Sequence, residues 1–126
     1  MRILREIIAE ILSRVGEGYP IGARLSLDEF TSWGYNLDYG VKAAKALEEA
    51  GATYISTDVG TQGTIYMQVP PTVIPLGFAL YAVAAVKKAV NIPVIAFGRI
   101  NDPIMAEQIL KDGNADFIGM CRQLIC

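Results

Sequence analysis

The sequence predicts an α/β fold in which about four parallel strands alternate with helices, as in one half of a (β/α)8 TIM barrel. Short apolar runs rich in β-branched residues recur near residues 21, 54, 94 and 117, separated by stretches of helical character. No Gly-x-Gly-x-x-Gly turn follows the first run, so a barrel is favoured over a doubly wound dinucleotide-binding sheet. A complete barrel has eight strands in about 250 residues, whereas this chain has 126 residues.

Composition predicts a single globular domain over residues 1–126. The chain is 52% hydrophobic and 19% charged, and its net charge is −2, with no basic cluster larger than Lys87-Lys88. These values argue against a nucleic acid or an anionic membrane as partner. Histidine is absent, and Cys121 and Cys126 provide neither a disulfide framework nor a metal site, so we expect inert thiols and a cytoplasmic location.

The first part of the chain predicts a helix, a strand, a loop and a second helix. Residues 1–16 carry one apolar stripe at helical spacing, and the charges between its apolar residues exclude a signal peptide. Residues 20–26 (PIGARLS) form a short apolar run bounded by proline and glycine, which is typical of a strand. A loop long enough for a functional role follows over residues 27–36, and residues 38–51 form a helix with Asp38 as its N-cap.

The middle of the chain predicts a strand over residues 53–57 and then a long excursion. Residues 58–75 contain repeated glycine and proline, so we expect a loop that faces a substrate. Residues 76–89 form an apolar helix that is shorter than the ~20 residues needed to span a membrane, so we expect it to be buried.

Residues 91–122 carry the clearest pattern. Residues 92–97 and 115–120 have the length and apolar character of strands buried on both faces. Between them, Asp102 is placed to cap a helix that begins at Pro103 and ends at Asp112-Gly113. The turns that follow these strands lie at their carboxyl ends, which is where parallel α/β proteins bind ligands.

Polar residues at these strand ends are the candidates for a site. Arg24 lies on a strand predicted to face the interior, where a guanidinium requires either a ligand or an ion pair with a carboxylate such as Asp58. Asp58 ends the next strand, either as a substrate contact or as a turn cap. Gly98 is either a turn glycine or, together with Arg99, part of a phosphate site.

Two further groups remain open on the residues alone. Arg122 follows the last predicted strand, and it is either a ligand contact or a surface residue near the end of the chain. Trp33, Tyr35 and Tyr39 either stack on a ligand or pack against the neighbouring helix.

Four segments together resemble the second half of the flavin-binding (β/α)8 barrel of the Old Yellow Enzyme family. The segments are GARLS (22–26), ALEEAGATYIS (46–56), NIPVIAFGRINDP (91–103) and ADFIGMCR (115–122). The most similar branch contains 2,4-dienoyl-CoA reductase, 2-enoate reductase and the bile-acid-inducible NADH:flavin oxidoreductases. The order of the segments implies that the strands are the fifth to eighth of the barrel.

The resemblance implies FMN as cofactor and NADH or NADPH as reductant. It places Arg24 beside the pyrimidine edge of the flavin, where a permanent cation stabilises the negative charge of the reduced ring. It implies that Gly98, Arg99, Cys121 and Arg122 hold the FMN phosphate, and that the loops after the first two strands border the substrate pocket. Cys121 is a departure, because the family usually has glycine or alanine there.

The resemblance implies a fragment of an FMN-dependent NAD(P)H oxidoreductase that reduces activated C=C bonds of small unsaturated carbonyl compounds. The first half of the barrel, with its substrate-orienting and proton-donating residues, and the iron–sulfur region of this branch are expected to be missing. No catalytic residue is therefore assigned, and we expect little or no reductase activity from the chain alone. Two alternatives remain: a non-catalytic half-barrel that pairs with itself or with a complementary half, and a phosphate-binding barrel of the triose or indole type.

Overall fold

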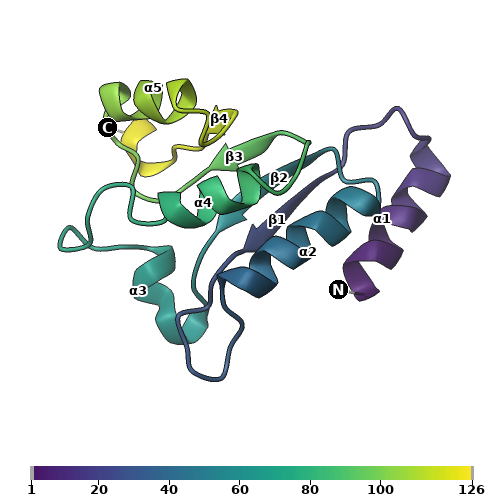
Figure 1. Cartoon of the computed structure of the whole chain (residues 1–126), viewed down its shortest axis with the longest axis horizontal. Coiled ribbons are helices and arrows are strands. Elements are labelled where there is room, and N and C mark those ends of the chain that lie inside the picture. The colour runs from purple at the N-terminus through teal and green to yellow at the C-terminus, as the bar shows by residue number, and fades with distance from the viewer. Residues whose placement is uncertain (1, 126) are drawn as a thin grey trace.

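The computed structural model describes residues 2–125 and has the expected half-barrel architecture, with parallel strands alternating with helices (Figure 1). The strands lie in the order β1-β2-β3-β4, which is also their order in the chain. The strands are β1 (Gly22–Ser26), β2 (Tyr54–Asp58), β3 (Val94–Ala96) and β4 (Phe117–Ile118). The helices are α1 (Arg2–Val15), α2 (Leu37–Glu49), α3 (Ile65–Gln68), α4 (Leu80–Lys87) and α5 (Pro103–Lys111), with 3-10 turns at Gln62–Thr64 and Arg122–Leu124.

One face of the sheet is covered by helices. Helices α2 and α4 lie side by side across this face, while α1 lies beyond β1 (Figure 1). Alternate residues of the strands point into this layer, and the largest side chains there are fully buried, as expected for apolar residues removed from water. They are Leu27, Leu47, Ile55, Val83, Val86 and Val94.

The opposite face of the sheet is open, so the prediction that the strands are buried on both faces is wrong. Ile95 on β3 is only half-buried, and Phe117, its partner in register on β4, is 57% exposed. The physical reason is that, among residues 2–125, the helices packed on the sheet lie on its other face. In a closed barrel this open face would point toward the barrel axis.

Several predicted boundaries differ from the structure. Asn36 rather than Asp38 caps α2, because the side chain of Asn36 accepts the backbone N–H of Tyr39 and Asp38 already lies in the first helical turn. The 58–75 excursion contains a 3-10 turn and the short helix α3, so it is not loop throughout. Helix α4 begins at Leu80 rather than residue 76, since Gly77 has a positive φ of 64° that a helix does not accommodate.

The helix expected after Pro103 is confirmed. The Asp102 carboxylate accepts the backbone N–H of Ile104 at 2.9 Å, Pro103 is the first helical residue, and Gly113 ends the segment with φ 68°. Met1 and Cys126, which the first predicted helix and the inert-thiol prediction include, lie outside the described residues. No helix among residues 2–125 is long and apolar enough to cross a membrane.

Candidate functional site

Arg24 and Asp58 form an ion pair on the open face of the sheet. They come from neighbouring strands, and both Nη2 and Nε of Arg24 donate to Oδ2 of Asp58, at 3.0 and 3.2 Å. The other carboxylate oxygen of Asp58 accepts the backbone N–H of Val59 at 2.9 Å, which fixes the carboxylate at the end of β2. The pairing considered from the sequence is therefore present.

The surroundings of Arg24 differ from the buried environment that the sequence predicted. Its side chain is 51% exposed, because the face of the sheet on which it lies is open. The Phe97 ring lies against the guanidinium, 4.7 Å from the ring centroid to Cζ, and Nη1 lies 3.5 Å from the hydroxyl of Ser56. The carboxylate and the aromatic ring both favour this position of the charged group.

The four residues predicted to bind phosphate come together at the carboxyl ends of β3 and β4. Gly98, Arg99, Cys121 and Arg122 line one small cavity, and Phe97 lines it too. Phe97 also contacts Arg24, so one residue links the two groups that were predicted from separate segments.

Four backbone N–H groups of these turns have no partner within the described residues. Among residues 2–125, the N–H groups of Gly98, Arg99, Cys121 and Arg122 have no hydrogen-bond acceptor. Free backbone N–H groups beside positively charged side chains are suited to binding an anion.

The turn after β3 has an unusual backbone. Gly98 has φ 121°, and a Cβ added to it would lie 3.0 Å from the Cβ of Ala79, so the position is both strained and crowded for any other residue. Arg99 has φ 49°, which is uncommon for a residue with a side chain. These two positive φ angles turn the chain sharply beside the cavity. Backbone strain of this kind often occurs at ligand sites.

The side chain of Arg99 is bound to the loop before α4. Its Nη1 donates to the carbonyl oxygen of Thr72 at 2.8 Å and also to that of Ile74. Arg99 and Arg122 then line a cleft of about 260 Å³ together with Asn101. The side chain of Arg99 thus ties the turn after β3 to the loop before α4. Its backbone N–H has no acceptor within the described chain.

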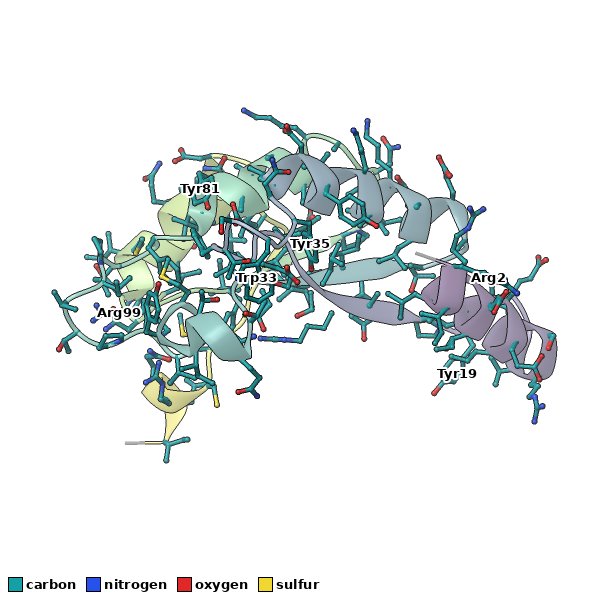
Figure 2. All side chains as sticks on the ribbon, turned by 90° about the horizontal axis from the view of Figure 1, so that it is seen from below. Arg2, Tyr19, Trp33, Tyr35, Tyr81 and Arg99 are labelled. Carbon is teal, nitrogen blue, oxygen red and sulfur yellow. The ribbon has the colours of Figure 1, made fainter. Side chains whose placement is uncertain are left out.

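The loops after β1 and β2 are held together at the same end of the sheet. The backbone N–H of Gly60 donates to the carbonyl of Asp28 at 2.7 Å, and the Thr64 hydroxyl donates to the carbonyl of Glu29 at 2.9 Å. Figure 2 shows Trp33 on the Arg99 side of the molecule and Tyr35 near its middle. The two loops therefore form one connected wall beside the site.

The aromatic residues of this wall behave differently from one another. Tyr35 packs against Tyr39, with ring centroids 5.2 Å apart, as the packing alternative predicted. The Tyr35 hydroxyl donates to the carbonyl of Ser26 at 2.8 Å, while burial raises the pKa of this phenol above its ordinary value of 10.0. Trp33 is 77% exposed, so it is the one aromatic of the three left largely free for contact with another molecule.

Sequence reasoning missed Phe97 and Ser56. Both lie on the open face of the sheet and both approach Arg24. Strand alternation could have placed Ser56 beside Arg24 once the register was known, whereas the position of Phe97 depends on how far β3 extends beside β2. In residues 2–125 no group of three or more His, Cys, Asp or Glu side chains is placed to hold a metal ion.

Comparisons with known proteins agree on one class. The profile of the NADH:flavin oxidoreductase / NADH oxidase family matches residues 1–126. An NADH oxidase of Thermoanaerobacter brockii is 42% identical over 99% of this chain and 19% of its own length, and a cinnamate reductase of Clostridium sporogenes is 30% identical over 99% and 21%. A solved complex of 2-naphthoyl-CoA reductase superposes with TM-score 0.84 at 29% identity, over 96% of this chain and 18% of its own. The chain thus spans about a fifth of the length of these relatives.

Proposed function

The chain belongs to the NADH:flavin oxidoreductase / NADH oxidase family, and from this premise we propose that it forms the C-terminal half of an FMN-binding barrel in an enzyme that reduces activated C=C bonds. Enzymes of this family carry FMN and take electrons from NADH or NADPH. The observation that carries the proposal is that Phe97 contacts Arg24 and also lines the cavity of Gly98, Arg99, Cys121 and Arg122.

The residues present fit FMN in charge and in donor type. A phosphate needs N–H donors and positive charge, and the turns after β3 and β4 offer four free N–H groups and the side chain of Arg122 within the described chain. Cys121 is compatible with this role, because a phosphate contact there requires its backbone N–H and not its thiol. A flavin ring needs donors at its polar edge, and Arg24 on the neighbouring part of the open face retains N–H groups without an acceptor.

Each residue has a distinct part in this proposal. Bound FMN would supply a carrier that accepts hydride from the nicotinamide and passes hydride to the β-carbon of an unsaturated carbonyl compound. Arg24 would stabilise negative charge at the polar edge of the ring, and Gly98 would allow the backbone to approach the phosphate. The wall formed by the loops after β1 and β2 would border the substrate, with Trp33 exposed on it.

The substrate class is the finer part of the proposal. Support comes from the cinnamate reductase and 2-naphthoyl-CoA reductase relatives, whose names describe reductases of unsaturated acids or thioesters. Asp58 is predicted to contact substrate, and its carboxylate lies 3.0 Å from Nη2 of Arg24. A location in the cytoplasm stays a prediction, as does a single domain over residues 1–126.

Cofactor retention tests the proposal. The purified chain is mixed with FMN, passed through a gel-filtration column and examined by visible absorption. We expect the eluted protein to retain flavin absorbance, and Arg122→Gln to weaken FMN binding by about tenfold, because a charge-assisted hydrogen bond contributes roughly 1.5 kcal/mol or more. Lys45→Gln, which removes the same charge from an exposed position on α2, is the matched control. A colourless protein, or equal weakening in both variants, would contradict the proposal.

A second candidate function is pairing with another half-barrel, either a second copy or a complementary half. Among residues 2–125, β1 and β4 each have a neighbouring strand on one side only. The open face also carries an apolar hollow of about 450 Å³ lined by Tyr54, Ile95 and Phe117 with Pro20, Thr53 and Pro93. Free strand edges and an open apolar face favour association.

Light scattering during gel filtration tests this second candidate. A dimer would have twice the chain mass of 13.7 kDa, and Phe117→Ser would shift it toward the monomer by placing a polar side chain in the hollow. A wild-type chain that is monomeric and folded at all concentrations would rule out pairing with itself. Pairing with a complementary half would then require a second polypeptide.

A further inference from the structure

Asp58 contacts Arg24 at an offset along the sheet. The two residues are not opposite each other in the sheet: Arg24 is in register with Ser56, and Asp58 with Ser26. The arginine side chain therefore leans along the strands toward their carboxyl ends to reach the carboxylate. Its contact is made side-on, with Nε and Nη2 both donating to one oxygen.

This side-on contact leaves part of the guanidinium available. Arginine has five N–H donors, of which two go to Asp58 and one points to the Ser56 hydroxyl at 3.5 Å. The remaining two, one on each terminal nitrogen, have no acceptor among the described residues. The Phe97 ring lies against the guanidinium, which favours this orientation of the group.

The same carboxylate changes the electrostatics of the site. A guanidinium is always charged at physiological pH, so an unpaired arginine would favour any negative charge that develops beside it. The Asp58 carboxylate, 18% exposed and 3.0 Å from Nη2, offsets part of that field. Solvent around the half-exposed arginine screens the effect but does not remove it.

We propose that Asp58 is a positioning residue, which orients the free N–H groups of Arg24 toward the cofactor and limits how strongly the site prefers reduced over oxidised FMN. This inference rests on the proposed FMN site and adds to it a residue that sets the reduction potential. Asp58 acts through Arg24 and does not need to touch the flavin.

The test uses the FMN-loaded chain and the variant Asp58→Asn. Asparagine keeps an oxygen that can accept the Val59 N–H, so the fold at the end of β2 is preserved while the charge is lost. We expect the affinity for reduced FMN relative to oxidised FMN to rise about tenfold, which corresponds to a reduction potential about 30 mV more positive for a two-electron couple. The potential is measured by equilibrium reduction against a reference dye.

Two further variants separate positioning from a general charge effect. Glu49→Gln removes one negative charge from an exposed position on α2, and we expect no change in potential. In a chain that already carries Arg24→Gln, Asp58→Asn should shift the potential by less than it does in the wild type, because the part of its effect that acts through the orientation of Arg24 is gone and only the direct field of the carboxylate remains.

The outcomes distinguish the inference from the function on which it rests. A wild-type chain that binds no FMN overturns both. A wild-type chain and an Asp58→Asn variant that bind FMN with the same potential overturn the inference alone, as does a shift of equal size in the Arg24→Gln background.

Discussion

The two faces of the sheet use the same strands for different purposes. Toward the helices, alternate residues such as Leu25, Ile55 and Val94 are almost fully buried and apolar. Toward the open side, the alternating positions hold Arg24, Tyr54 and other half-exposed side chains. Stability of the isolated chain therefore depends on the covered face, whereas the candidate chemistry lies at the carboxyl end of the open one.

This difference also explains where polar groups are tolerated. Among residues 2–125, the buried polar residues are Thr57 and Thr64. Thr57 on β2 is buried toward the helices, and its hydroxyl donates to the carbonyl of Ile95 at 2.8 Å. On the open side, an arginine and a carboxylate lie together without complete burial, which avoids the large desolvation cost of an enclosed ion pair. Mutations on the two faces should therefore separate stability from cofactor binding.

The largest effect on stability should come from the covered face. Leu47 is completely buried between α2 and the sheet, so Leu47→Ala should lower the free energy of unfolding by about 3 kcal/mol through lost burial and a residual cavity. Urea unfolding followed by circular dichroism measures this. Ile104→Ala, at a side chain 80% exposed, is the control and should change stability by less than about 0.5 kcal/mol.

A smaller loss in the free energy of unfolding is expected on replacing Asp116, which connects β3, β4 and α4. Its carboxylate accepts the backbone N–H of Val94 at 2.8 Å and the ammonium of Lys87 at 2.7 Å. Burial acts to raise the pKa of Asp116, but the hydrogen bonds from Lys87 and Val94 outweigh it and hold the pKa below its ordinary value of 3.8. Allowing for screening at this partly exposed pair, Asp116→Asn should cost about 1 kcal/mol at pH 7.

The lowered pKa of Asp116 also sets a pH dependence. The ionised carboxylate contributes stability above pH 3.8, and this contribution is lost as pH falls below that value toward the lower pKa of the folded state. Unfolding measured between neutral and acid pH should therefore show a smaller acid loss in Asp116→Asn than in the wild type. Equal acid losses in the two proteins would contradict this assignment.

At neutral pH, Tyr35→Phe should lower the free energy of unfolding by as much as Asp116→Asn or slightly less. It removes the hydrogen bond to the carbonyl of Ser26, with an expected loss of roughly 1 kcal/mol. Because burial raises the pKa of Tyr35, the folded state favours the neutral phenol, and this contribution is present below pH 10.0 and lost as pH rises through the raised value. The free energy of unfolding should accordingly fall less between neutral and alkaline pH in the variant than in the wild type, and equal losses in the two proteins would contradict the raised pKa of Tyr35.

The smallest effect on stability should come from the open face. Phe117 is 57% exposed, so its side chain buries little apolar area in the monomer. Phe117→Ala should therefore lower the free energy of unfolding of the monomer by less than about 1 kcal/mol. Measurement at low protein concentration isolates the monomer. A loss as large as that of Leu47→Ala would mean that the two faces of the sheet contribute equally to the stability of the monomer.

The sequence by itself determined the order and type of the four strands and of the longer helices, but not α3 or the 3-10 turns. Apolar runs of strand length, helical stripes and the Asp102-Pro103 start of α5 depend on neighbouring residues, so local physics specifies them. It also identified glycine and arginine at the ends of the strands, and these residues do gather at one cavity. Parallel connectivity brings all carboxyl ends to one edge whatever the side chains are.

Only the tertiary structure decided which face of each strand is covered and what Arg24 contacts. Periodicity cannot show that β3 and β4 lack a cover on one side, because an apolar strand reads the same whether its second face is buried or open. Likewise the Arg24 contacts with Asp58 and Phe97 join residues far apart in the chain, and they depend on strand register and side-chain direction. Such contacts follow from packing in three dimensions, which no local pattern specifies.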